Sequence, residues 1–232
     1  MIYIKKLIGF TYYKLKKIFK PSNLIFIIIS FTKSKFLSTI RAKKIYNIET
    51  AKQLAVNDNL EVYKFHKSYF EKFLLPDKNL TLLDFGCGTG RYLDLQKLYK
   101  KVYLVDISKH NLKIASEVAD KIKVEYETIQ GSFNSIKNQI DIFFSVGVFG
   151  IQYPFNKKTV RNIYSTLNPN GKAIFTVKNN DFEDQEVYQE VLALSESRIL
   201  EILESYNFFI ERVDFPSIRG KKESMIVVEL KK

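Results

Sequence analysis

A short apolar run that leads directly into a glycine-rich turn is the feature that most constrains this chain. Residues 80–85 are mostly apolar, and three glycines follow at alternate positions: Gly86, Gly88 and Gly90. A buried strand, a glycine turn and a helix form the ligand crevice at the carboxyl end of a strand in open α/β sheets. Glycine lets the backbone take positive φ, and the helix that follows points its first N–H groups at the ligand. The run therefore predicts an α/β fold with a ligand site at the turn.

The rest of the chain alternates between strand and helix patterns, as expected for a doubly wound sheet. The expected strands are 80–85, 102–106, 123–127, 141–150, 172–178, 208–215 and 223–230, and the expected helices are 91–100, 108–120, 157–167 and 195–206. The last two strands predict a closing antiparallel hairpin. Before the fifth strand, residues 168–171 predict a turn in which Gly171 takes positive φ.

Asp106 ends the second expected strand, 16 residues after Gly90. An acidic residue at this place accepts hydrogen bonds from the ribose hydroxyls of a bound nucleoside. An NAD enzyme uses the same position, so Asp106 predicts a nucleoside without choosing the cofactor.

The numbers of cysteine and histidine residues limit the disulfides and metal sites that this chain can form. The only cysteine, Cys87, excludes an internal disulfide and a multi-cysteine zinc site, and two histidines leave little material for a metal centre. We therefore expect no metal and a reducing, cytoplasmic setting. The 232 residues are enough for one domain of ordinary size with an extension.

Positive charge is concentrated at the N-terminus. Residues 1–44 hold 11 Lys or Arg and no Asp or Glu, which leaves 26 basic and 25 acidic residues for the remainder. Residues 2–20 predict a basic amphipathic helix, and the apolar run 24–31 is shorter than the roughly 20 residues of a membrane-spanning helix. Residues 2–31 could contact a membrane surface, or cap the domain or a second copy. A nucleic-acid arm is disfavoured because the lysines alternate with aliphatic residues.

The expected domains are a basic extension at 1–45 and a ligand-binding domain at 46–232, with a helical lid at 46–75. Within the lid, Tyr63 and His66 are three residues apart and can share a helix face.

The spacing Asp84-x-Gly86-x-Gly88-x-Gly90 resembles the nucleotide loop of class I S-adenosylmethionine-dependent methyltransferases of the small-molecule type. In the dinucleotide fingerprint the third glycine comes one place later. The pattern Leu-x-Pro-x-Gly-Lys at 167–172 also resembles this family, and the likeness spans about residues 60–232. It implies a Rossmann-like, seven-stranded, mostly parallel sheet with helices on both faces and a C-terminal antiparallel hairpin.

The resemblance further implies S-adenosylmethionine as cofactor and methyl transfer to an oxygen or nitrogen atom of a small acceptor, such as a lipid-like or glycan precursor. The residues expected to contact the cofactor are Asp84, Phe85, Gly86, Cys87, Gly88, Gly90, Asp106, Ile107, Ser132, Phe133, Ser145 and Val146. In the family Asp84 would face the amino end of the methionine portion.

Two positions depart from the family pattern. Ser132 stands where an Asp often holds the adenine amino group, and residues 150–153 lack the usual histidine. A hydroxyl acceptor needs a base, for which His66, Tyr153 and Tyr63 are the candidates.

Three alternatives remain open at this point. The domain's near-neutral charge disfavours an RNA methyltransferase. The glycine spacing and the terminal hairpin disfavour an NAD enzyme. The two departures leave room for a non-catalytic cofactor-binding scaffold.

Overall fold

The computed structural model describes residues 61–178, 194–206, 208–214, 217–218, 221–222 and 225–232. The chain divides into two units, residues 1–42 and 43–232, and all described residues belong to the second. The expectations for the basic extension, its boundary and the first part of the lid lie outside the described residues.

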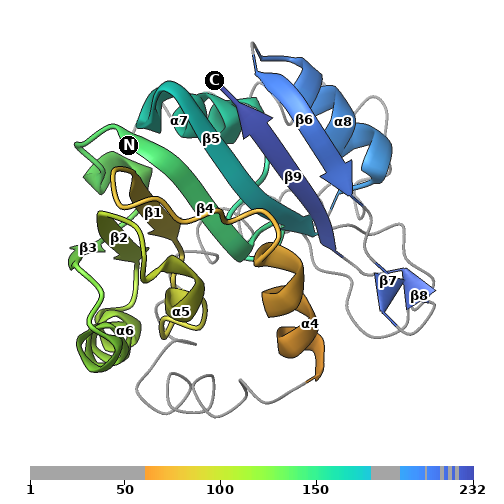
Figure 1. Cartoon of the computed structure of the whole chain (residues 1–232). Coiled ribbons are helices and arrows are strands. Elements are labelled where there is room, and N and C mark those ends of the chain that lie inside the picture. The colour runs from red at the N-terminus through yellow and green to blue at the C-terminus, as the bar shows by residue number, and fades with distance from the viewer. Residues whose placement is uncertain (1–60, 179–193, 207, 215–216, 219–220, 223–224) are drawn as a thin grey trace, which may run out of the picture. The chain divides into compact units, whose positions relative to one another are not determined.

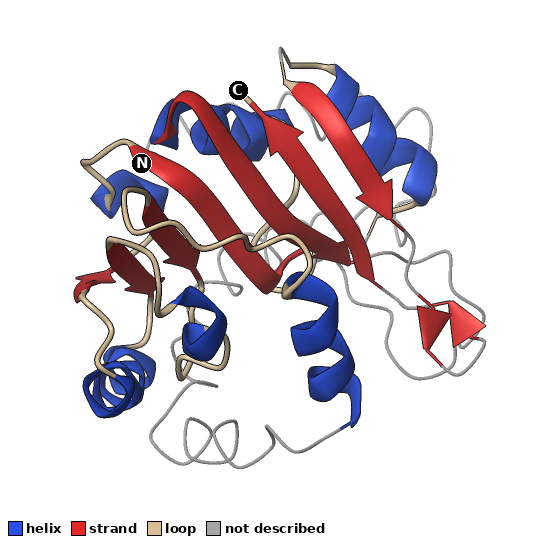
Figure 2. Ribbon diagram, in the orientation of Figure 1, coloured by secondary structure: helices blue, strands red, loops and turns tan. Residues whose placement is uncertain are grey.

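A seven-stranded sheet forms the centre of the described unit (Figures 1 and 2), with strand order β3-β2-β1-β4-β5-β9-β6. Its strands are β1 (Thr81–Phe85), β2 (Lys101–Asp106), β3 (Tyr126–Gln130), β4 (Ile140–Phe149), β5 (Leu167–Lys178), β6 (Phe209–Asp214) and β9 (Met225–Lys231). The first five in this order are parallel, and β9 runs antiparallel to both β5 and β6. The order reverses at β1, which lies between β2 and β4, so a ligand crevice is expected at the carboxyl end of β1.

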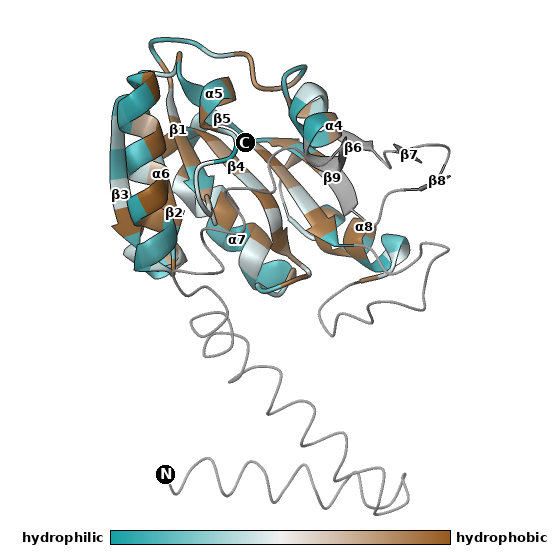
Figure 3. Cartoon of the chain, turned by 90° about the horizontal axis from the view of Figure 1, so that it is seen from below, coloured by the Kyte–Doolittle hydropathy of each residue, from teal (hydrophilic) through white to brown (hydrophobic). Residues whose placement is uncertain are grey.

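Helices cover both faces of this sheet. On one face lie α4 (Glu61–Phe70), α5 (Leu93–Gln96) and α6 (Lys109–Ile122), and on the other α7 (Lys157–Thr166) and α8 (Glu196–Glu204). Figure 3 shows α4 and α5 opposite α7 and α8. Successive strand side chains point to opposite faces, so Leu82 joins the core under α4–α6 and Leu83 the core under α7 and α8. The predicted fold class is confirmed.

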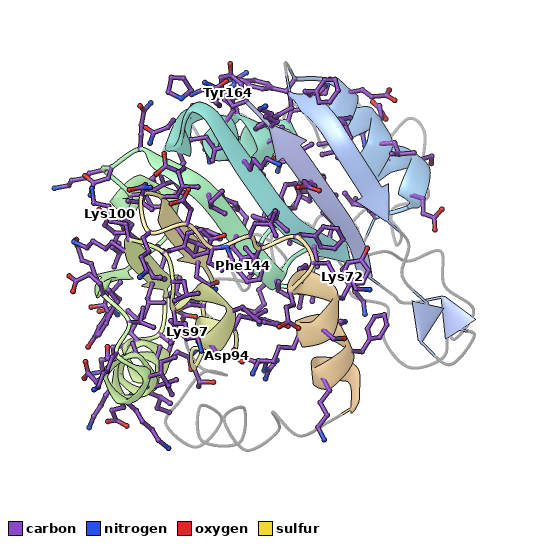
Figure 4. All side chains as sticks on the ribbon, in the orientation of Figure 1. Lys72, Asp94, Lys97, Lys100, Phe144 and Tyr164 are labelled. Carbon is purple, nitrogen blue, oxygen red and sulfur yellow. The ribbon has the colours of Figure 1, made fainter. Side chains whose placement is uncertain are left out.

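Phe144 of β4 shows how the first helical layer is held. Its ring lies 5.3 Å from that of Phe70 and 5.5 Å from that of Tyr92, both edge-on. Figure 4 labels Phe144 at the middle of the sheet. These aromatic pairs seat the end of α4 on the central strands.

Smaller elements complete the described chain. A single 3-10 turn covers Phe133–Ser135, and the connection between β6 and β9 contains a two-residue pair, β7 (Ser217–Ile218) with β8 (Lys221–Lys222).

Three local expectations were wrong. The strand expected at 123–127 is β3 at Tyr126–Gln130, because Lys123 still caps α6 in a left-handed conformation with φ of 59°. The helix expected at 91–100 is the four-residue α5, because Leu95 N bonds to Tyr92 O and Tyr99 N to Gln96 O in tight i+3 turns on either side. Residues 168–171, expected to form a turn before the fifth strand, lie within β5, and the positive φ of 66° belongs to Asn170 and not to Gly171. Gly171 is needed for close packing instead, since a Cβ there would lie 2.9 Å from the Asn168 carbonyl oxygen.

Asp141 of β4 links three central strands, because it bonds to Thr81 of β1 and Asn168 of β5. It lies at the end of the sheet where β1 begins, away from the glycine turn. Its Oδ2 accepts 2.8 Å hydrogen bonds from both N and Oγ1 of Thr81, and its Oδ1 accepts one of 2.7 Å from Asn168 Nδ2. Burial acts to raise the pKa of this carboxyl, but the bonds from Thr81 and Asn168 and the charge of Lys100 outweigh it, so the pKa is lowered. Asp141 therefore has a structural role.

Asp141→Ala is expected to lower the free energy of unfolding by about 2 kcal/mol, because charged-group hydrogen bonds at Thr81 and Asn168 are lost. A lowered folded-state pKa stabilises above the ordinary value of 3.8, and this contribution disappears as the pH falls through the folded pKa. Urea unfolding should thus separate the variant from the wild type at pH 7 and much less at pH 2. An equal difference at both pH values would contradict this assignment.

Candidate cofactor and active site

The glycine turn after β1 is fastened to β2 by its own backbone. Gly86 N and Cys87 N both donate to Val105 O, at 2.7 and 3.1 Å. Gly86, Gly88 and Gly90 all have positive φ, at 74°, 56° and 82°. A Cβ on Gly88 would meet nothing within 4 Å, whereas one on Gly86 would overlap the Val148 Cγ2 methyl group. Gly88 thus leaves open space beside the main chain, and Gly86 allows the turn to pass β4 closely.

Asp106, at the carboxyl end of β2, organises the other side of this turn. Its Oδ2 accepts a 3.0 Å bond from Gly88 N, and its Oδ1 accepts one of 2.7 Å from Ser108 N. Asn111 Nδ2 lies 3.4 Å from each oxygen. Burial, with 7% of the residue exposed, raises the pKa of Asp106, and the bonds from Ser108 and Gly88 oppose this. The carboxylate is held in place at the position predicted for the ribose.

Asp84 lies two residues before the first glycine and is only 2% exposed. Its Oδ2 accepts a 2.8 Å hydrogen bond from Gln96 Nε2 of α5. Burial raises the pKa of Asp84 to about 7, the bond from Gln96 opposes this rise, and the charge of Asp106 adds to it. The turn is therefore flanked by two carboxyl groups that repel one another and that a cationic ligand would favour in their ionised forms.

Asp84 makes stability depend on pH in the direction opposite to Asp141. Its folded-state pKa of about 7 exceeds the ordinary value of 3.8. The contribution of Asp84 to the free energy of unfolding is therefore greatest below pH 3.8, and it is lost as the pH rises through about 7. Asp84→Asn should remove most of this slope and raise the melting temperature at pH 8 by about 2 °C or more. The nearby Asp106 and Cys87 also have raised pKa values, and Asp106 should supply the slope that remains. Melting curves from pH 4 to 8 test this, and an unchanged slope in the variant would contradict it.

The other predicted cofactor residues lie near these two carboxyl groups. Gly131 N donates to Asp106 O at 2.9 Å, which brings Ser132 beside the end of β2, and Ile107 O accepts a bond from Gln130 Nε2. Ser145 Oγ donates to Phe85 O at 2.8 Å, so β4 reaches the turn, followed by the half-buried Val146.

Phe133 and Cys87 are buried in the two cores. The Phe133 ring stacks on Phe85 at 4.3 Å, and it is packed against Phe143 and Tyr153. Burial raises the pKa of the Cys87 thiol well above its ordinary range, so it stays neutral. Both side chains contribute packing beneath the turn, and their contact with the cofactor stays a prediction.

The three candidate bases do not form one cluster. His66 is buried on α4, with its ring 6.5 Å from Phe70 on the face of α4–α6. Tyr153 packs against Phe85 and Phe133 in the other core, where burial raises the pKa of its hydroxyl. Tyr63 lies within α4, but its side chain is outside the described residues. Their catalytic role stays a prediction.

Sequence reasoning missed Gln96 and Asn111, the two amides that donate to the site carboxylates. Each is almost completely buried on the helix that follows its carboxylate's strand. The only signal in the sequence is their position after the glycine turn and after Asp106. Within the described part of the chain, no group of three metal-ligating side chains comes together, and no helix is long and apolar enough to cross a membrane.

A family model described as a methyltransferase domain matches residues 76–207, so the chain belongs to this methyltransferase family. Among solved structures, it is similar to an S-adenosylmethionine-dependent methyltransferase from Aquifex aeolicus (22% identity, 80% of this chain and 98% of that chain, TM-score 0.63). It is also similar to magnesium protoporphyrin IX methyltransferase from Synechocystis PCC 6803 with bound S-adenosylmethionine (17% identity, 84% and 97%, TM-score 0.64). No curated protein matches the sequence.

These findings confirm the predicted family, and with it S-adenosylmethionine as the cofactor. They favour this cofactor over the NAD alternative.

Proposed function

We propose that this chain transfers the methyl group of S-adenosylmethionine to an oxygen or nitrogen atom of a small molecule. The observation that carries the proposal is the placement of Asp84 and Asp106 on either side of a turn that is open at Gly88. The near-neutral charge of residues 45–232 supports a small acceptor over RNA, which a strongly basic surface would favour.

The residues present fit this cofactor. Asp106 would accept hydrogen bonds from the ribose hydroxyls, and Asp84 would face the ammonium end of the methionine portion. The open space at Gly88 allows the main chain to lie against the ligand. Buried oxygens of Gln96 and Asn111 have no hydrogen-bond partner among the described residues, as expected beside a polar ligand site.

When bound, the cofactor supplies an activated methyl group on a sulfonium that leaves as a neutral thioether. The chain supplies positioning, and alignment of reacting groups can lower a barrier by about 7 to 11 kcal/mol in favourable cases. A hydroxyl acceptor must also lose a proton, for which His66, Tyr153 and Tyr63 remain the candidates. The raised pKa of Tyr153 keeps it a neutral phenol, which suits it better to orienting an acceptor by hydrogen bonding.

The first test is calorimetric titration of the purified chain with S-adenosylmethionine and S-adenosylhomocysteine, with NAD as control. Micromolar binding of the first two and none of NAD would support the proposal. Failure of both to bind the folded chain would overturn it and favour a scaffold role.

Methyl transfer is then followed with radiolabelled cofactor and separate small-molecule, lipid, RNA and protein fractions of a cell extract. Label is expected in the small-molecule or lipid fraction. Label in RNA alone would contradict the proposed acceptor class.

The proposal extends to a membrane-surface contact through residues 2–31, which would bring the enzyme to a lipid-like acceptor. It rests on the basic amphipathic pattern of that segment, because these residues lie outside the described part. Sedimentation with vesicles rich in anionic lipid should retain the full chain and lose it when residues 1–44 are removed. Absence of binding by the full chain would overturn this part.

A further inference from the structure

Among the described residues, Gln96 is the only side chain that donates a hydrogen bond to Asp84, with 2.8 Å between Nε2 and Oδ2. It is the last residue of α5 and is completely buried. Asp94 of α5 and Lys97, the residue that follows this helix, are both exposed, and Figure 4 labels them beside α5. The amide is thus turned inward, away from the surface of α5 and toward β1.

The other end of this amide is left unsatisfied. Gln96 Oε1 is buried and has no hydrogen-bond partner among the described residues. A buried acceptor without a partner lowers stability, and an apolar side chain of similar size would avoid this loss, although it would leave Asp84 without its side-chain donor. A residue kept at a cost to stability usually serves the site it touches. Packing alone therefore does not account for a glutamine at this position.

We propose that Gln96 is a positioning residue for the cofactor, which orients the Asp84 carboxylate toward the ammonium group of the methionine portion. This inference rests on the proposed function, because it takes the role of Asp84 from it. The amide fixes one carboxylate oxygen, so the plane of the carboxyl group is set before the ligand arrives.

Asn111 provides a matched comparison on the nucleoside side. Its Nδ2 lies 3.4 Å from both oxygens of Asp106, and its Oδ1 is also buried without a partner in the described part of the chain. Asp106 has two shorter backbone bonds, from Gly88 and Ser108, whereas Gln96 provides the recorded side-chain donor to Asp84. We therefore expect each amide to affect a different end of the ligand, and Gln96 to matter more.

The test uses two ligands that differ at the methionine end. S-adenosylhomocysteine carries the ammonium group, and 5′-methylthioadenosine has the same nucleoside and sulfur without it. Gln96→Met removes the donor at nearly constant volume. It should weaken S-adenosylhomocysteine binding by about tenfold or more and leave 5′-methylthioadenosine within about twofold. The melting temperature should fall by a few degrees, because the buried Asp84 carboxyl group loses its recorded side-chain donor. Asn111→Leu should weaken both ligands in parallel.

A parallel loss of both ligands in Gln96→Met, or unchanged binding of both, would overturn the inference alone. Gln96→Glu is a second test if the Gln96→Met variant does not fold. This substitution keeps the shape of the side chain but places a second carboxyl group against Asp84. It too should weaken S-adenosylhomocysteine selectively, and a variant that binds both ligands like the wild type would overturn the inference. Failure of the wild type to bind either ligand would overturn the proposed function as well.

Discussion

Asp106→Ala is expected to weaken binding of S-adenosylmethionine and S-adenosylhomocysteine by at least about 100-fold, because the proposed role of Asp106 is to accept hydrogen bonds from two ribose hydroxyls, and hydrogen bonds to a charged acceptor contribute about 1.5–3 kcal/mol each. The substitution is also expected to disturb the backbone of the glycine turn. Gly88 N and Ser108 N both donate to this carboxylate, so the backbone beside the open space loses its anchor. Calorimetric titration measures the loss.

The folded state should survive this substitution, since burial already disfavours the charged form of Asp106. Asp94→Asn is the matched control. Asp94 is also an aspartate on the α4–α6 face, but it is exposed and pairs with Lys67 at 2.8 Å, a contact of small energetic value. The Asp94→Asn variant should bind both ligands with an affinity within about twofold of that of the wild type. A folded Asp106→Ala chain with wild-type affinity would show that the ribose lies elsewhere.

The sheet could be predicted because its signals are local. The apolar run before Gly86 identifies a strand buried on both faces, and its core residues Leu82 and Leu83 do divide between the two faces. The alternation of elements then restricts the topology, since a strand joined to a parallel neighbour needs a crossover connection. A local signal also accounts for the start of α6, where the Ser108 side chain caps the helix by accepting a hydrogen bond from Asn111 N, the usual role of serine at this position.

The parts of the site that could not be predicted depend on long-range contacts. Gln96 stands between Leu95 and Lys97, and nothing near it in sequence shows that its amide reaches back 12 residues to Asp84. Likewise, Gly171 has the composition of a turn residue, but the backbone oxygens it must avoid include that of Asp141, 30 residues away. Side-chain direction and close backbone approach are decided by tertiary packing, which a local pattern does not carry.

For the candidate bases, the sequence grouped residues that the structure places apart. His66 and Tyr153 were grouped by chemistry, yet one packs on the α4–α6 face and the other in the core under α7 and α8. A general base must come within hydrogen-bond reach of the proton it removes. The choice between them therefore depends on where the acceptor binds.

Gly86→Ala and Gly88→Ala are expected to damage different properties, although both residues have positive φ. At either position alanine adds about 1–2 kcal/mol of left-handed strain. At Gly86 the new methyl also overlaps Val148 Cγ2, and such overpacking costs about 1–3 kcal/mol more. Gly86→Ala should therefore lose about 2–5 kcal/mol of stability, which corresponds to a melting temperature lower by roughly 5–15 °C.

Gly88→Ala should melt within a few degrees of the wild type, because a Cβ there meets nothing within 4 Å. It should nevertheless weaken S-adenosylhomocysteine binding by about tenfold or more, since the added methyl occupies space that the ligand needs against the main chain. Melting curves and titration of both variants separate the two effects. If Gly88→Ala binds like the wild type, the ligand does not lie against this glycine. If Gly86→Ala melts no lower than Gly88→Ala, β4 yields at Val148, and close packing is not what requires the first glycine.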